Sequence, residues 1–513
     1  MKLAKLPIGI QTFSEIRDKK ENYLYIDKTD IAYELLNCSK YIFLSRPRRF
    51  GKSLFMDTVQ EIFQGNKELF EGLTIYDKWD WDVKYPVIKI VFGKILNPRQ
   101  LETTIIDTLE VNGERLGLEC KNIEDYAICF KELIRKAYEK YDQKVVVLID
   151  EYDKPILDNI DNIEVAKEMR DILSRLYTEI KNADEYIKFT MLTGVSKFSK
   201  ASIFSGLNML DDISLDPQYG NICGYTQENI ENEFLPYLEG VDLKQLKLWY
   251  NGYNFLKDDV YNPFDILLFI KNHKTYKNYW FKTGTPSFLI KLIEKNNYFL
   301  PKLANLTVGE KLLDSFDIEN LDFEVVLYQA GYLTIDKVIT TRRGQTQYKL
   351  KLPNEEVRAS LFDVILDFMT SQPTEKLQFQ NDIYDALMDA ELDDLELYLT
   401  SMFESIPNNN FTNNNLPHFE GYYASVIFAY FQSLGCDIVA EDITNKGRMD
   451  LSIKLNNIIY ILEFKMGDGD AMGQIKEKNY AKKYLSLKRD IYLVGINFDE
   501  NERNISRFEW EKI

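Results

Sequence analysis

The chain has 513 residues, 45% of them hydrophobic and 13% aromatic, which indicates a fully globular protein. At a usual size of roughly 150 residues per domain, this length predicts about three domains. The 63 Lys and Arg residues against 81 Asp and Glu residues give a net charge of −18. So acidic a surface disfavours general binding to nucleic acid but leaves room for a local basic groove.

Cysteine and histidine, the residues that form disulfide frameworks and many metal sites, are scarce. The five cysteines are scattered without C-x-x-C spacing, which predicts reduced thiols and neither a disulfide framework nor a zinc site. With two histidines in total, His273 and His418, a histidine-rich metal site is excluded. The sequence has no signal-peptide core and no uninterrupted apolar run of ~18 residues, so we expect a cytoplasmic protein without a membrane partner.

Residues 23–29 predict a short strand and then a helix that begins at Thr29. Because the stretch precedes the phosphate-loop candidate described next, it is a candidate flap over the adenine side of a nucleotide. An ordinary packing strand is an alternative that the sequence leaves open.

A phosphate-binding loop is predicted between a buried strand at 41–44 and a helix over 54–63. In such a loop, backbone N–H groups and the helix N-terminus meet the phosphates, Lys52 supplies a positive charge and Ser53 ligates Mg²⁺. Arg46 stands where the G-x-x-x-x-G-K-[ST] pattern has its first glycine, so the match is partial. A basic turn that caps a helix stays the alternative.

Three further apolar runs predict strands of the same sheet: 85–92, 144–150 and 186–196. Buried parallel strands are continuously apolar, and their carboxyl ends face the ligand crevice. After the second run, Asp150 is expected to hold Mg²⁺ through water and Glu151 to orient or deprotonate the attacking water. Thr193 or Ser196, at the end of the third, is a candidate sensor of the γ-phosphate.

The helix predicted for 164–180 carries Arg170 and Arg175. Either is a candidate arginine finger, but surface ion pairing is the favoured role for both.

In this order the stretches resemble the bacterial AAA-ATPase-like proteins over most of residues 5–300. The stretches that carry the resemblance are 25–29, 46–53, 150–155, 193–199, 204–208, 249–253 and 261–263. Arg-Pro-Arg-Arg-Phe-Gly-Lys-Ser is the form that the loop takes in this family, and Pro47 is expected to stiffen it. The resemblance implies ATP as the ligand, bound by these residues: Arg46, Pro47, Arg48, Arg49, Phe50, Gly51, Lys52, Ser53, Asp150 and Thr193.

The middle of the chain, 236–375, is mainly helical in pattern, with two strands joined by an Arg342-Arg343-Gly344 turn. This pattern predicts a winged-helix-like lid, with a packing subdomain as an equal alternative. A Ser-Gln-Pro break near 375 and an Asn-rich loop at 408–415 then indicate a domain boundary, and a helix is expected over 420–435.

Asn456-Asn457 predicts a two-residue hairpin turn, because Asn tolerates a positive φ. This turn pairs residues whose numbers sum to 913, which places apolar residues opposite one another and Asp450 opposite Glu463. Two carboxylates roughly 5 Å apart repel unless a divalent cation lies between them. Lys465 projects from the same face, and two acids and a lysine around Mg²⁺ can bind a scissile phosphate and activate water. A solvated hairpin face is the alternative.

The hairpin resembles the PD-(D/E)xK nuclease superfamily, in the form that is often fused to these ATPases. The matching stretches are 447–450, 461–465 and 474–480, with Met449 in place of the superfamily's proline. The resemblance implies that Asp450 and Glu463 ligate the metal and that Lys465 is catalytic. It further implies an accessory acid and two supporting residues: Glu420, Gln474 and Tyr480.

A basic stretch over 476–489, with Tyr480 and Tyr484 interleaved, is the best candidate for a nucleic-acid track, and a solvated helix face is an equal alternative.

The sequence therefore predicts an α/β protein with a parallel-sheet P-loop ATPase domain at 1–235, a lid at 236–375 and a nuclease-like α/β domain at 376–513. ATP and Mg²⁺ are the expected cofactors, with Mn²⁺ as an alternative at the nuclease site, and DNA or RNA is the expected partner. Two alternatives stay open. One is a nucleotide switch whose degenerate nuclease-like domain only binds nucleic acid or protein, and the other is an ATPase motor or scaffold that assembles into a homo-oligomeric ring.

Overall fold

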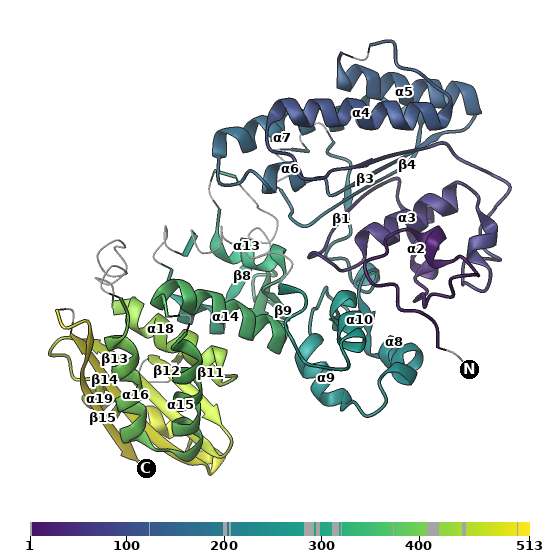
Figure 1. Cartoon of the computed structure of the whole chain (residues 1–513). Helices are drawn as coiled ribbons and strands as arrows, with labels where there is room; N and C mark the ends of the chain where they lie inside the picture. Colours follow the sequence, from purple (N-terminus) through teal and green to yellow (C-terminus); the bar gives the residue numbers. More distant parts are fainter. Residues whose placement is uncertain are drawn as a thin grey trace. The chain divides into compact units, whose positions relative to one another are not determined.

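The computed structural model (Figure 1) describes residues 3–122, 124–198, 203–204, 207–281, 292–293, 298–309, 318–319, 321–372, 374–407, 420–443, 448–499 and 501–513. Parts of the stretches 193–199, 204–208 and 447–450 and the Asn-rich loop lie outside these residues, as does the side chain of Glu420. The chain divides into two compact units, Met1–Thr283 with Gly309–Ile335 and Gly284–Val308 with Asp336–Ile513. The predicted three-domain division, with boundaries near 235 and 375, stays a prediction.

A five-stranded parallel sheet organises the first unit, in the strand order β2-β3-β4-β1-β5. Its strands are β1 (Tyr41–Ser45), β2 (Val87–Val91), β3 (Val145–Asp150), β4 (Ile187–Gly194) and β5 (Asp211–Asp212). Every residue of β3 is buried, as expected of a strand covered on both faces. The predicted parallel sheet is therefore confirmed, and β4 lies between the strand before the phosphate loop and the acidic strand.

Helices cover both faces of this sheet (Figure 1). On one face lie α4 (Pro98–Leu116), α5 (Tyr126–Tyr141) and α7 (Ile163–Asn182), and on the other lie α2 (Thr29–Cys38) and α3 (Lys52–Phe63). The short helices α1 (Phe13–Ile16) and α6 (Lys154–Leu157) complete this part of the chain. The Asn97 side chain caps α4, whose first residue is Pro98, and a left-handed Gly117 ends it.

Two local expectations are wrong. Residues 24–28 form no strand, and only an isolated bridge joins Tyr23 to Lys5, although α2 does begin at Thr29 as predicted. Cys120 and Cys129 form a disulfide. The start of α5 places their Cα atoms 5.4 Å apart, a proximity that sequence spacing alone does not reveal.

The rest of the first unit packs aromatic and aliphatic side chains around α9 (Leu243–Tyr250) and α10 (Pro263–Lys271). Two further elements, α8 (Gln227–Asn229) and the pair β6 (Tyr225–Thr226) and β7 (Val260–Tyr261), lie in the same part of the chain. Helix α13 (Phe323–Ala330) also belongs to this unit.

A three-stranded sheet, β8-β10-β9, is formed by one strand that precedes α13 along the chain and two that follow it. Its strands are β8 (Thr307–Gly309), β9 (Thr334–Thr340) and β10 (Thr346–Lys351). Gly344 has φ +74° in the turn between β9 and β10, which confirms the predicted Arg342-Arg343-Gly344 turn. The function of this region as a lid stays a prediction.

The second unit carries a mixed sheet in the order β11-β12-β13-β14-β15. Its strands are β11 (Asp437–Ile443), β12 (Arg448–Leu455), β13 (Ile458–Met466), β14 (Asp490–Asp499) and β15 (Asn504–Lys512). Only β13 and β14 run parallel to each other. The helices of this unit are α14 (Glu355–Thr370), α15 (Lys376–Asp389), α16 (Leu392–Glu404), α18 (Glu420–Ser433) and α19 (Ala471–Lys478).

Among the described helices, none combines the length and the apolar character that crossing a lipid bilayer requires. The cytoplasmic location stays a prediction.

Candidate functional site

The phosphate loop connects the end of β1 at Ser45 to the start of α3 at Lys52. Two of its residues lie in the left-handed region, Arg49 at φ +68° and Gly51 at φ +95°. Residues with a side chain rarely adopt the second angle, so the backbone conformation itself favours glycine at position 51. Crowding is not the reason, since no atom of the described residues lies within 4 Å of an added Cβ there. The loop thus turns tightly into the helix N-terminus, as a phosphate site needs.

Lys52 is buried against its own loop. Its Nζ donates hydrogen bonds to the carbonyl oxygens of Arg46 at 2.9 Å and Pro47 at 3.0 Å. Burial lowers the pKa of Lys52, and the nearby charge of Asp150 opposes that shift. The ammonium is therefore held at the loop by neutral carbonyls that an anion can replace.

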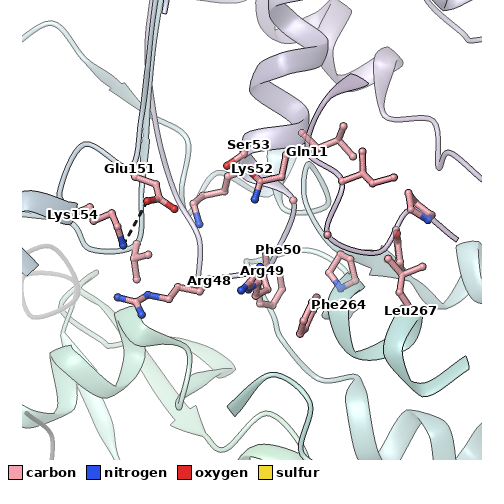
Figure 2. Close-up of a pocket in the computed structure, with 18 of the residues that line it drawn as sticks. Gln11, Arg48, Arg49, Phe50, Lys52, Ser53, Glu151, Lys154, Phe264 and Leu267 are labelled. Carbon is pink, nitrogen blue, oxygen red and sulfur yellow. Dashed lines mark ion pairs between the residues drawn. The ribbon is translucent and has the colours of Figure 1, made fainter. Parts of the chain in front are cut away.

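A cavity of about 350 Å³ surrounds this loop (Figure 2). Figure 2 shows Glu151 and Lys154 on one side of Lys52, and Phe264 and Leu267 on the other. Glu151 and Lys154 therefore make one end of the cavity charged, whereas the other end has the apolar side chains Phe264 and Leu267 with Arg49 beside them.

The tips of β3 and β4 meet beside the loop. Thr193 Oγ1 donates a hydrogen bond of 2.5 Å to Asp150 Oδ1, and both side chains are buried. Glu151, at φ +53°, turns into the cavity and lies 3.7 Å from Lys154 Nζ. Burial raises the pKa of Glu151, while Lys154 opposes the shift.

Asp153 is a site residue that no role was predicted for. It lines the cavity, and its Oδ2 accepts hydrogen bonds from the backbone N–H groups of Val195 and Ser196 and from Ser196 Oγ. Burial raises the pKa of Asp153. Ser196, a candidate sensor, is thus fixed by Asp153, and the signal in the sequence was the second aspartate of the Asp-Glu-Tyr-Asp run.

The arginines of the loop are divided between two positions. Arg46 is 1% exposed, and its guanidinium donates to the carbonyl oxygens of Ser45, Ser214 and Tyr219 and stacks over the ring of Phe255 at 4.0 Å. Arg46 therefore stabilises the loop through backbone carbonyl groups, and its predicted contact with a nucleotide stays a prediction.

Arg48 and Arg49 are exposed and line the cavity. The Arg49 guanidinium lies 4.8 Å from the ring centroid of Phe264. The two candidate fingers on α7 form ion pairs instead, Arg170 with Asp171 and Arg175 with Asp125.

In the C-terminal sheet, the register of β12 and β13 confirms the predicted hairpin. Leu451 pairs with Leu462 and Leu455 with Ile458, around a turn at Asn456 with φ +50°. Asp450 Oδ2 accepts a hydrogen bond of 2.8 Å from the backbone N–H of Phe464, the residue after Glu463. The two predicted acids therefore lie at the same end of the hairpin.

Glu463 is 1% exposed and is the centre of this cluster. Its Oε1 accepts a hydrogen bond of 3.2 Å from Lys465 Nζ and another from the side-chain amide of Gln474. Its Oε2 is buried and has no hydrogen-bond partner within the part of the chain that the structure describes. Burial, and after it the nearby charge of Asp450, raise the pKa of Glu463 to about 7, although Lys465 opposes the shift.

Tyr480 lies beside these residues. Its side chain is buried and hydrogen-bonds with Gln474, and burial raises the pKa of its hydroxyl. Asp450, Glu463, Lys465, Gln474 and Tyr480 are thus brought together, as predicted. Helix α18 begins at Glu420, whose side chain lies outside the described part of the chain.

The donor set fits a hard divalent cation. No group of three His, Cys, Asp or Glu side chains among the described residues is arranged to hold a metal. Asp450 and Glu463 nevertheless supply carboxylate oxygens, the ligands that Mg²⁺ prefers, and water usually fills most of its remaining positions. The orphaned Oε2 and the raised pKa are both costs that a cation at this place relieves.

The basic stretch gives a mixed result. Lys482, Lys483, Lys488 and Arg489 are exposed, whereas Lys476 forms an ion pair of 2.5 Å with Glu511. The two interleaved tyrosines, Tyr480 and Tyr484, are buried in the core of the domain. They cannot stack on bases, because they fill the space between α19 and the sheet.

Comparisons with known proteins match a segment of each half of the chain. Residues 7–204 match the family model described as a predicted AAA-ATPase, and residues 418–508 match that of the PD-(D/E)XK nuclease superfamily. The chain is 44% identical over 520 residues to an uncharacterized protein in the vnfD 5′ region of Azotobacter chroococcum mcd 1, with 100% of both chains covered. The phosphate loop lies inside the first matched segment, and the acid–lysine cluster lies inside the second.

Proposed function

We propose that this chain, which belongs to the family of predicted AAA-ATPases with a C-terminal domain of the PD-(D/E)XK nuclease superfamily, binds and hydrolyses ATP in its first unit and cuts DNA or RNA at a Mg²⁺-dependent site in its second. Mn²⁺ is the alternative ion at the second site. A role in defence or in mobile-element biology accords with this pair of activities.

For ATP, the residues around the cavity supply each function that hydrolysis needs. Lys52 exchanges the carbonyls of Arg46 and Pro47 for phosphate oxygens. Ser53 ligates Mg²⁺, and Asp150 holds it through water. Glu151 accepts the proton of the attacking water, and its raised pKa makes it a stronger base than an exposed carboxylate.

The observation that carries the nuclease proposal is the buried carboxylate of Glu463. Its Oε1 is held by Lys465 and Gln474, and its Oε2 has no hydrogen-bond partner among the described residues. Asp450 and Glu463 hold Mg²⁺, which when bound polarises the scissile phosphate and lowers the pKa of a water. Lys465 contributes the positive charge that stabilises the negative charge developing on the phosphate. Gln474 and Tyr480 keep Glu463 in position.

Two variants separate the two activities. Lys52→Met is expected to abolish ATP hydrolysis. Asp450→Asn is expected to abolish cleavage of nucleic acid and to hydrolyse ATP at the rate of the parent. Steady-state phosphate release and cleavage of labelled DNA and RNA, single- and double-stranded, measure these outcomes. A parent protein that releases no phosphate in Mg²⁺, with and without nucleic acid, would contradict the ATPase assignment. The effect of Lys52→Met on cleavage shows whether ATP gates the nuclease.

A further inference from the structure

An apolar recess of about 80 Å³ adjoins the cavity around the phosphate loop. The two hollows share these lining residues: Pro7, Phe50, Gly51, Leu54, Tyr225 and Pro263. They therefore meet at the loop itself, on the walls formed by Phe50 and Gly51. The charged residues Glu151 and Asp153 line the larger hollow and not the recess.

One cation, Lys28, lines this recess, and it is the only charged side chain among the described residues that do so. The half-buried Lys28 donates a hydrogen bond to Asn229 Oδ1 at 3.3 Å, which is long for a charge-assisted bond. Asn229 is itself fixed by the capping box that it forms with Thr226. An ammonium has three donors, so Lys28 keeps donor capacity toward the recess.

A packing role alone does not explain a lysine at this place. Burial lowers the pKa of Lys28, which shows that its charge is kept at a cost. The walls around it are apolar or aromatic, among them Leu24, Phe55 and Ile222. A methionine would fill the same space without that cost, so the charge points to a ligand.

We propose that the recess takes the purine base of the bound nucleotide and that Lys28 donates a hydrogen bond to an acceptor on the edge of that base. The inference rests on the proposed binding of ATP. The triphosphate extends along Lys52 toward Glu151, which leaves the other side of the loop for the base. A purine is flat and apolar on its faces and carries ring-nitrogen acceptors on its edge, which suits aromatic walls with one donor.

Equilibrium binding in Mg²⁺ tests this assignment with three probes, ATP, GTP and inorganic tripolyphosphate. We expect Lys28→Met to weaken the binding of the preferred purine nucleotide by about tenfold, since a hydrogen bond to a charged group is worth about 1.5 kcal/mol or more. The affinity for tripolyphosphate should not change. Lys20→Met, at an exposed lysine in the same segment, is the control and should change neither value. Comparison of the affinities for ATP and GTP shows which of the two purine bases the recess prefers.

Equal losses for nucleotide and tripolyphosphate, or no loss at all, would overturn the assignment. If Lys28→Met does not fold, Cys223→Met decides by the same comparison, because it adds volume at the wall of the recess. A parent that binds tripolyphosphate as tightly as ATP and GTP also overturns it, while leaving a phosphate-binding site in place. A parent that binds none of the three contradicts the proposed ATPase function and this assignment with it.

Discussion

Lys465 Nζ lies 3.2 Å from Glu463 Oε1, two residues along the same strand. Alternate residues of a strand share a face, so the cation and the carboxylate are held together by β13 itself. Gln474 contacts the same oxygen from α19. With Oε1 fixed by two donors, the remaining oxygen of Glu463 is positioned before any metal arrives, which is the condition for a preorganised site.

The raised pKa of Glu463 predicts a pH-dependent stability for the metal-free protein. The folded state keeps a proton between pH 4.5 and about 7 that the unfolded chain releases, so stability falls as pH rises through that window. A pKa shift of this size corresponds to about 3 kcal/mol in the free energy of unfolding. Glu463→Gln should remove the fall in apparent Tm between pH 5 and 8, and Mg²⁺ at pH 8 should raise the Tm of the parent but not that of Glu463→Gln. The exposed Glu477→Gln is the control and should behave like the parent.

Thr193→Val tests the contact between β4 and β3. The variant keeps the shape of the side chain but removes the donor to Asp150, which leaves that buried acid with the backbone N–H of Glu151. We expect ATP hydrolysis to fall by about tenfold or more while ATP binding changes by less than about threefold. Phosphate release and equilibrium binding give the two numbers.

Thr190→Val is the matched control, because Thr190 lies on the same strand and its buried hydroxyl has no hydrogen-bond partner among the described residues. If both threonine variants hydrolyse ATP alike, the contact with Asp150 has no part in the reaction.

Gly331→Ala is expected to disturb the phosphate loop from a distance in the sequence. Gly331 follows α13 with φ +93°, and a Cβ there would lie 2.7 Å from Pro47 Cβ. The variant should lower both the apparent Tm and the affinity for ATP, because Pro47 supplies one of the carbonyls that hold Lys52.

Gly344→Ala separates the contact from backbone strain. Gly344 has a similar φ of +74°, and within the described part of the chain no atom lies within 4 Å of an added Cβ. Backbone strain in this variant should lower the free energy of unfolding by about 1 kcal/mol and the apparent Tm with it, without changing the affinity for ATP. Equal ATP affinities for the two glycine variants would show that Gly331 and Pro47 are not coupled.

The two exposed arginines of the loop are expected to contribute charge near the phosphates. Arg48→Ala and Arg49→Ala should each weaken the binding of ATP by a factor of about three to ten, which is a smaller loss than that expected for Lys52→Ala. Arg170→Ala, which removes a surface ion pair on α7, is the control. If the loop variants bind ATP as well as the parent while Lys52→Ala does not, Arg48 and Arg49 serve packing or partner contacts.

The hairpin of the second unit could be predicted in detail because a one-residue slip would turn Leu451, Ile453 and Leu455 out of the core. The register therefore followed from the apolar pattern, and the position of Asp450 and Glu463 followed from the register. Strand β3 was predictable for a related reason, since a strand buried on both faces has no polar residue until its end at Asp150. The two-residue strand β5 has no such apolar run and was not predicted.

Side-chain directions within loops could not be predicted in this way. Arg46 and Arg48 are two residues apart in one basic loop, yet one is buried against Phe255 and the other lines the cavity. The disulfide between Cys120 and Cys129 and the position of Lys28 beside the loop both depend on how distant elements pack. No local period in the sequence records such packing.

Cleavage of labelled DNA and RNA in Mg²⁺, with and without ATP, tests the central claim most directly. The parent and the control Lys488→Met, at an exposed lysine of the same domain, should produce cut strands at similar rates. Lys465→Met should be slower by roughly a hundredfold or more, because it removes the charge that stabilises the reacting phosphate. Cleavage by Lys465→Met at the rate of the parent, or no cleavage by the parent on any of these substrates, would contradict the account.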